Sequence, residues 1–353
     1  MRSLTEGEAI TIRSLLASES ISERERTRRS KVPARTFARA RRRAYDEGWV
    51  FDRYIPDPRR LGMPLCTFAL VQPFAEQMAS MVQKWGDDPL NILLWRWPEM
   101  LLGVFVSEAA EAMTQDRIGA SESVRKEFWL TADTRSAQLP VYFDFEGAWS
   151  RFIGQEGTLA YPHPLPAIAL EGTAPTSFSS AERGKVLSMV SVTTGGSTAT
   201  KPLRGSPFFL PRSQQRLLSE GAIERRTFLD INKIPPYQDR ALESVVFIHG
   251  NLAAGATADQ LFGRLSAIDV SPFLFVEDGS RILLAALSPN PESQSHRRTG
   301  VTVLGNVQQF VNEIEVERLP VSLMTIHANH RYERLLAPSG SVRPRGSRQE
   351  LPP

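Results

Sequence analysis

The chain has 353 residues, of which 41% are hydrophobic and 23% are charged, so wholesale disorder is excluded and two or three domains can form. No apolar run approaches the roughly 18 residues that span a bilayer, and charged residues interrupt the first thirty positions, where a signal peptide needs an apolar centre. We therefore predict a cytoplasmic protein without membrane contact. Its single cysteine, Cys66, excludes an internal disulfide and a cysteine-rich metal site.

The net charge of +3 hides an uneven distribution. Residues 1–60 hold 15 basic and nine acidic side chains, a net charge of +6, whereas the other 293 residues sum to −3. A basic end on a mildly acidic body is typical of a polyanion-binding module, because phosphate contacts supply most nonspecific nucleic-acid affinity. The N-terminal segment is therefore a candidate nucleic-acid interface.

This segment is predicted to form three short helices and a hairpin. Thr5 can cap the first helix, and Ser22 with Glu25 forms a capping box at the start of the second. The third helix, over residues 34–48, ends at Gly48 in the left-handed conformation, and one of its faces carries Phe37, Ala40, Ala44 and Tyr45. The sequence "WVFDRYIPDP" that follows is predicted to be a strand closing into a turn, the wing of a winged helix.

A ferredoxin-like order of β-α-β-β-α-β is predicted next. It comprises a buried strand "MPLCTFALVQ", an amphipathic helix "FAEQMASMVQKW", a strand pair "NILLWRW" and "MLLGVFVS", a short helix near residues 108–115 and a strand "EFWLTA". The segment "LPVYFDFEGAWSRFI" adds a further strand. Pro and Gly are then frequent up to residue 177, which is typical of an extended connector.

The remainder resembles the first half, in the same order. "RLLSEGAIERRTFLDI" from Arg216 parallels "RAYDEGWVFDRYIPD" from Arg43 at an offset of 173, and "SVVFIHGN" parallels "TFALVQPF". Several ordered matches indicate a tandem duplication. We predict an α+β chain, a tandem repeat of a winged helix-turn-helix and a ferredoxin-like domain. The predicted units are winged helices at 1–60 and 178–236, ferredoxin-like domains with an additional strand at 61–153 and 237–336, a connector at 154–177, and a disordered basic tail at 337–353.

The third helix is the best candidate for reading DNA. A recognition helix presents long donor side chains from its first turns, and Arg35, Thr36 and Arg39 occupy those exposed positions. Arg42 and Arg43 lie further along, where phosphate contact is expected. An arginine-rich solvated helix is the alternative interpretation.

The segment "SERERTRRSKVPARTFARARRRAYDEGWVFDRYIPDPRRLGMPLCTFALVQ" resembles the winged helix-turn-helix and first effector-domain strand of the leucine-responsive regulator (Lrp/AsnC) family. Its characteristic steps are Glu47-Gly48-Trp49-Val50 and Leu61-Gly62. The resemblance implies DNA contacts in the first copy and a dimerising, effector-sensing domain from Met63. The second copy either reads DNA as well or is retained for packing. The resemblance implies that Arg35, Thr36 and Arg39 face DNA, and the full set of predicted DNA-binding residues is Arg28, Lys31, Arg35, Thr36, Arg39, Arg42, Arg43, Arg212, Gln215 and Arg216.

These observations predict a nucleoid-associated, sequence-specific transcription regulator that binds double-stranded DNA. A small-molecule effector and a second copy of the chain are further expected partners. A plasmid-type replication initiator with tandem winged helices and a protein-binding winged-helix scaffold are the alternatives. We predict no enzymatic activity, catalytic residue, cofactor or metal: "VFIHGN" lacks the serine elbow of a hydrolase, and His327 and His330 lack a third ligand nearby.

Overall fold

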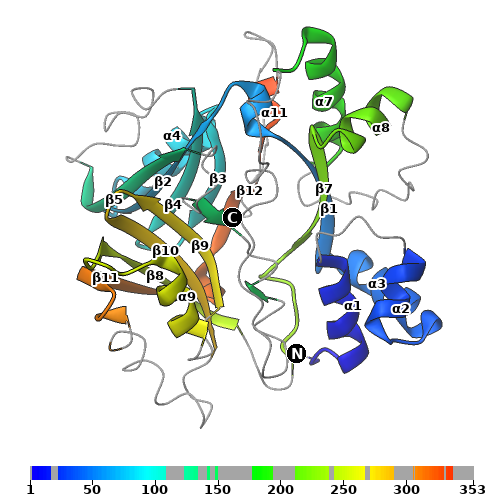
Figure 1. Cartoon of the computed structure of the whole chain (residues 1–353), viewed down its shortest axis with the longest axis horizontal. Helices are drawn as coiled ribbons and strands as arrows, with labels where there is room; N and C mark the ends of the chain where they lie inside the picture. Colours follow the sequence, from blue (N-terminus) through cyan, green and yellow to red (C-terminus); the bar gives the residue numbers. More distant parts are fainter. Residues whose placement is uncertain are drawn as a thin grey trace, which may run out of the picture.

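The computed structural model describes residues 2–16, 23–108, 123–133, 141–143, 148–149, 177–193, 211–237, 242–266, 271–289, 305, 307–329 and 331–336. Two five-stranded antiparallel sheets pack against each other, and a two-stranded ribbon flanked by helices stands beside them (Figure 1). This arrangement confirms the predicted α+β class. No described helix is long and apolar enough to cross a membrane.

Three helices open the chain: α1 (Glu6–Leu16), α2 (Glu23–Ser30) and α3 (Ala34–Asp46). Thr5 caps α1 as predicted, because its hydroxyl accepts from the Glu8 amide while the Glu8 carboxylate accepts from the Thr5 amide. The capping box at the start of α2 involves Ser22, which lies outside the described residues. In α3 the predicted apolar face is buried, and Gly48 follows with a φ of +69°. The third helix and its left-handed stop are thus confirmed.

The predicted wing hairpin is wrong. Strand β1 (Val50–Pro56) pairs antiparallel with β7 (Ile223–Leu229), and Arg53 lies opposite Arg226 at the centre of the register. No return strand follows β1, because Asp57 caps the short 3-10 helix η1 (Pro58–Leu61) and the chain continues directly into the first sheet. The backbone hydrogen bonds of β1 are therefore satisfied by a strand 173 residues away.

The first sheet has the strand order β12-β3-β4-β2-β5. Its members and their crossover helix are β2 (Leu65–Pro73), α4 (Met78–Asp87), β3 (Asn91–Arg96), β4 (Leu101–Ser107), β5 (Val124–Asp133) and β12 (Thr325–Asn329). The first four strands in chain order lie as 4-1-3-2, which is the ferredoxin-like arrangement. Most of the helix predicted near residues 108–115 lies outside the described residues.

The second sheet repeats this plan in the order β11-β8-β10-β9-β6. It consists of β6 (Val141–Phe143), β8 (Leu242–Leu252), α9 (Ala258–Ser266), β9 (Ser271–Asp278), β10 (Arg281–Pro289) and β11 (Val311–Pro320). The additional strands predicted near residues 139–153 and 320–336 are present, but each joins the other sheet: β6 pairs with β9, and β12 pairs with β3. The two sheets are thereby interlocked.

Helices α7 (Ser180–Thr193), α8 (Arg212–Ser219) and α11 (Glu333–Leu336) and the 3-10 helix η4 (Val321–Leu323) complete the described elements. Helix α7 packs on β1, while α1 packs on β7. The N-terminal helices thus contact the strand that follows α8, and α7 contacts the strand that follows α3. The second helix-turn-helix is not confirmed, since residues 194–210 lie outside the described part. The predicted connector and tail also lie almost entirely outside it.

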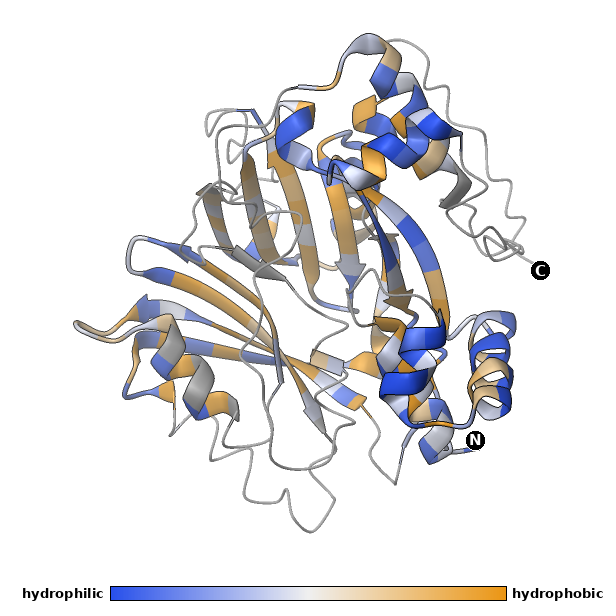
Figure 2. Cartoon of the chain, turned by 45° about the vertical axis from the view of Figure 1, so that its right-hand side comes forward, coloured by the Kyte–Doolittle hydropathy of each residue, from blue (hydrophilic) through white to orange (hydrophobic). Residues whose placement is uncertain are grey.

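The main hydrophobic core lies between the two sheets and continues onto the β1–β7 ribbon. Figure 2 shows the apolar residues along the strands of both sheets. Smaller cores lie under α4 and under α9, on the outer faces. Each sheet is therefore covered on both sides, which explains the continuous apolar runs that predicted its strands.

Candidate functional site

The facing surfaces of the two sheets change from apolar to polar at one end. On β8, Phe247 is buried in the core between the sheets, and the next residue on that face is His249. On β5, Leu130 is buried there, and Phe128 and Lys126 follow on the same face. The alternation of side chains along both strands thus brings polar groups to the end of the inter-sheet core.

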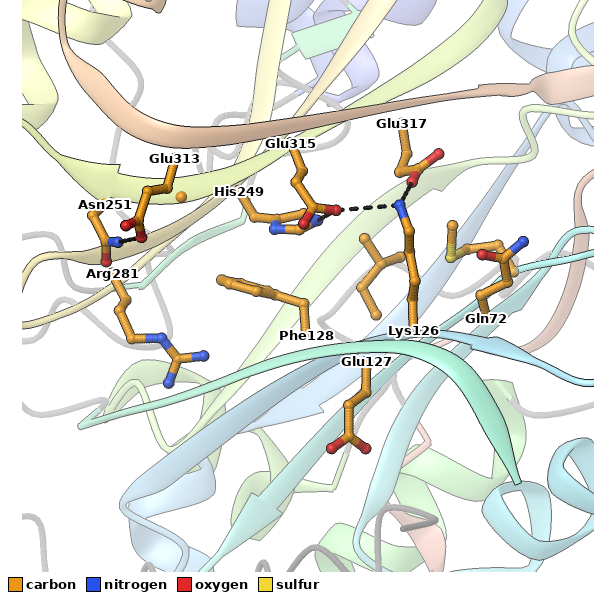
Figure 3. Close-up of a pocket in the computed structure, with 13 residues that line it drawn as sticks. Gln72, Lys126, Glu127, Phe128, His249, Asn251, Arg281, Glu313, Glu315 and Glu317 are labelled. Atoms are coloured by element: carbon orange, nitrogen blue, oxygen red, sulfur yellow. Dashed lines mark hydrogen bonds and ion pairs between the residues drawn. The ribbon is translucent and has the colours of Figure 1, made fainter. Parts of the chain in front are cut away.

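A cavity of about 360 Å³ lies at this end (Figure 3). Its volume equals that of roughly a dozen liquid waters and lies within the range of small-ligand sites. Residues from both sheets line it: Leu70, Gln72, Met100, Lys126, Glu127, Phe128, His249, Gly250, Asn251, Arg281, Glu313, Glu315 and Glu317.

His249 is a partly buried titratable group of the cavity, with a side chain 12% exposed. Its ring stacks on Phe128 at 4.2 Å between centroids, and its Nε2 lies 3.8 Å from Oε2 of Glu315. Burial lowers its pKa below the ordinary value of 6.5; the carboxylates of Glu315 and Glu317 partly oppose this shift, and the cations Lys126 and Arg281 add to it. The imidazole is therefore neutral at neutral pH.

Lys126 connects the two sheets at the edge of the cavity. Its ammonium lies 3.2 Å from Oε1 of Glu317 and 3.3 Å from Oε2 of Glu315, and Figure 3 shows it between the two carboxylates. Hydrogen bonds to Glu317 and Glu315 raise the pKa of Lys126. The side chain is half exposed, so the ion pair orients these groups more than it stabilises the fold.

Arg281 lies at the end of the cavity opposite Gln72 (Figure 3). Its guanidinium carbon lies 5.2 Å from the centroid of the Phe128 ring, and Nη2 donates to the backbone oxygen of Trp129 at 3.2 Å. Among the described residues no carboxylate forms an ion pair with Arg281. Its remaining donors are available to an anionic group, and guanidinium geometry matches a carboxylate.

A β-bulge shapes the wall beside Arg281. Between Asn312 and Glu315 the register of β11 against β8 shifts, and Glu313 takes a φ of +49°. Asn251 donates to Oε2 of Glu313 at 2.7 Å. A Cβ at Gly250 would lie 2.7 Å from the Asn312 carbonyl oxygen, so this strand position requires glycine. Strained backbone of this kind clusters at functional sites.

The cavity therefore combines a neutral imidazole, a guanidinium and several carboxylates in one pocket. Such a set can bind an anionic group and transfer protons. Within the described ranges no group of three His, Cys, Asp or Glu side chains is arranged to hold a metal ion.

The residues predicted to bind DNA lie elsewhere, on the helices. Arg35, Thr36 and Arg39 are exposed on α3. Arg42 pairs with Asp46 at 3.3 Å, and Arg43 pairs with two carboxylates, Glu47 at 2.6 Å and Glu8 at 3.3 Å.

The other predicted contacts are similarly dispersed. Arg28 on α2 pairs with Glu25 at 2.8 Å, and the exposed Lys31 occupies a turn with a φ of +57°. On α8, Arg212 and Arg216 are exposed, Arg216 pairs with Glu220, and Gln215 is half-buried. Much of the basic charge that suggested DNA binding is thus balanced locally, one helical turn away.

No family model and no curated protein matches this sequence. The chain resembles the crystal structure of the siroheme decarboxylase NirDL with a TM-score of 0.47 and 10% identity, over 94% of this chain and 97% of the other. A second structure, NirDL in complex with an iron-uroporphyrin III analogue, matches with a TM-score of 0.46 and 10% identity, over 93% of this chain and 97% of the other. A putative monooxygenase from Lactobacillus acidophilus NCFM matches with a TM-score of 0.28 and 7% identity, over 75% of this chain and 97% of the other.

This comparison contradicts four predictions. NirDL is an enzyme, and its complex contains an iron-uroporphyrin analogue. The predicted Lrp/AsnC-like transcription regulator, its sequence-specific DNA binding, its double-stranded DNA partner and the absence of enzymatic activity are therefore wrong. The replication initiator and the protein-binding scaffold receive no support either. The prediction failed because basic charge and helix spacing describe a fold and a surface, whereas function depends on a site.

None of the residues that line the cavity is among the residues predicted from the sequence to form a site. The sequence contains two signals: His249 directly follows an apolar run of four residues, and "NEIEVERLP" places Glu313, Glu315 and Glu317 at alternate positions. Neither signal identifies a site by itself, because the two strands that carry them pair only in the folded chain.

Proposed function

We propose that this chain is an enzyme that binds a small carboxylate-bearing substrate between its two sheets and transfers a proton at that substrate through His249. The observation that carries the proposal is the partly buried, neutral imidazole in a cavity that also holds Arg281.

Arg281 is the proposed anchor for the carboxylate. The cavity lining carries more acidic than basic side chains, but the charges are separated along it. Lys126 offsets Glu315 and Glu317 at one end, and Glu313 accepts a hydrogen bond from Asn251. An anionic group is therefore best accommodated at the guanidinium, where a bidentate contact can form.

His249 is the proposed general base and acid. A neutral imidazole accepts a proton without first losing one, and burial, which lowers the pKa of His249, keeps it in that form. The imidazolium that results lies beside Glu315, with Nε2 and Oε2 3.8 Å apart, so its charge is stabilised. The proton then returns to the substrate from the same nitrogen.

Binding is tested with phenylacetate, an aromatic carboxylate, by calorimetric titration. Replacing Arg281 with Met should weaken binding about tenfold or more, the effect of losing a charge-assisted hydrogen bond. Arg125→Met is the matched control, because Arg125 lies over Phe74 at 5.7 Å and does not line the cavity. Equal affinities of the two variants would contradict the assignment of Arg281.

Proton transfer is tested by deuterium exchange, followed by NMR in D2O, with phenylpyruvate, an aromatic carboxylate whose ketone makes the neighbouring carbon acidic. His249 takes the proton as the C–H bond breaks and the enolate forms, the imidazolium exchanges its proton with the solvent, and a deuteron returns to the carbon. His249→Gln should therefore lower the exchange rate to that of phenylpyruvate without protein. His327→Gln is the control, because burial also lowers the pKa of His327, on β12, but this residue does not line the cavity. A wild-type exchange rate in His249→Gln would exclude His249 as the base.

We further infer that the chain is a tandem duplication, with α1–α3 and β1 of the first copy corresponding to α7, α8 and β7 of the second. Two observations support this. The sequence match has an offset of 173, and the residues at the centre of the β1–β7 pair, Arg53 and Arg226, are also 173 apart. The boundaries proposed for the units are 1–60, 61–153, 178–236 and 237–336, with a connector at 154–177 and a tail at 337–353.

A further inference from the structure

Phe128 contacts both groups to which the proposed function assigns a chemical role. Its ring stacks with the His249 imidazole at 4.2 Å and an interplanar angle of 28°. The Arg281 guanidinium carbon lies 5.2 Å from the centroid of the same ring. Phe128 belongs to the first sheet, whereas His249 and Arg281 belong to the second. One ring thus links two functional groups of the opposite sheet.

The position of the ring is set by the first sheet and by the inter-sheet core. Phe128 lies opposite Leu70 in the β2–β5 register and packs against the core. Its neighbour on the same face, Lys126, is held by Glu315 and Glu317 of the second sheet. Strand β5 is therefore held at this point by its pairing with β2 in the first sheet and by the ion pairs of Lys126 to the second sheet.

We propose that Phe128 is a positioning residue that holds the His249 imidazole and the Arg281 guanidinium in the orientation in which they face the cavity. This inference rests on the proposed function for the roles of those two groups. Phe128 itself transfers no proton and binds no anion. It acts by occupying one side of each group, which limits their rotation and the access of water.

The ring also affects the charge state of the imidazole. Burial is the main cause of the lowered pKa of His249, and the stacked ring contributes part of that burial. The charged groups that face the imidazole are Glu315 and Glu317 from β11, Lys126 from β5 and Arg281 from β10. These groups remain when the ring is removed, so a change in pKa reports the ring itself.

The experiment compares Phe128→Leu with the wild-type full chain by NMR titration of histidine ring protons. His249→Gln identifies the signal among the five histidines of the chain. We expect the pKa of His249 to rise toward 6.5 in Phe128→Leu, because water reaches the imidazole, while the pKa of His327 stays unchanged. Phe128→Tyr, which keeps the ring, should leave both values as in the wild type.

Phe74→Leu is the matched control, since Phe74 carries Arg125 over its ring but does not line the cavity. Phenylacetate should bind about two- to fivefold more weakly to Phe128→Leu, the effect of losing a cation–π contact, and normally to Phe74→Leu. Phe128→Met provides a second ring-free variant if Phe128→Leu does not fold.

The outcomes separate the two proposals. If phenylacetate does not bind the wild type, the proposed function fails, while the titration of His249 still decides the role of Phe128. If both ring-free variants fold and the pKa of His249 in each equals that of the wild type, the positioning role of Phe128 is overturned. An equal rise in Phe74→Leu would also overturn it, because the effect would then be general to the domain.

Discussion

Asp52 is the residue at which the pairing between the two distant parts of the chain can be tested most directly. It lies on β1, and its side chain is only 5% exposed. Its carboxylate accepts from the Tyr45 hydroxyl at 2.9 Å, the Thr227 hydroxyl at 2.7 Å and the Arg225 guanidinium at 2.6 Å. Arg225 and Thr227 belong to β7, so this carboxylate joins α3, β1 and β7.

Asp52→Ala removes all three interactions and leaves the largely buried Arg225 unpaired. Breaking a buried ion pair costs about 3–5 kcal/mol, and the hydrogen bonds from Tyr45 and Thr227 are included in that range because the effects are not additive. We expect the free energy of unfolding to fall by about 4 kcal/mol. Asp52→Asn should cost roughly 2 kcal/mol, since its amide oxygen still accepts from both hydroxyls.

The assay is urea denaturation followed by tryptophan fluorescence, with the transition midpoint and slope fitted for each variant. Asp46→Ala is the control, because Asp46 pairs with Arg42 on the same helix but both side chains are at least half exposed. That change should cost at most about 0.5 kcal/mol. A loss below about 1 kcal/mol for Asp52→Ala with an unchanged slope would refute the buried network and the β1–β7 pairing.

Two further predictions concern stability. Gly250→Ala should destabilise the chain by about 1–3 kcal/mol, because its Cβ would lie 2.7 Å from the Asn312 carbonyl oxygen, whereas Gly86→Ala, in open space within α4, should stabilise it by roughly 0.5–1 kcal/mol. Thermal unfolding checks both, and equal shifts in the same direction would contradict the close approach of β11. Because the pKa of His249 is lowered in the folded chain, the unfolded chain binds more protons below about pH 6.5, so the free energy of unfolding should rise with pH up to that value. His249→Gln should flatten this rise in urea titrations, and an unchanged slope would exclude its contribution.

Local sequence patterns predicted most of the described elements. The periodicity of α3 and its stop at Gly48 depend on neighbours within a few residues, and the apolar runs of β2, β4 and β8 reflect burial of both sheet faces. The predicted wing hairpin was wrong because the composition of β1 indicates a strand but not the strand with which it pairs, which is β7. The candidate site was missed for the same reason, since Phe128 and His249 meet only when two sheets pack.

The sequence by itself determined the α+β class and the ferredoxin-like strand order, because these follow from the hydrophobic period along the chain. Only the tertiary structure decided which strands exchange between the sheets, where the apolar faces become polar, and which charged groups converge. Contacts such as Asp52 with Arg225 and Lys126 with Glu315 join residues more than 170 positions apart. Their free energy appears only after the chain has folded, so no local pattern records it.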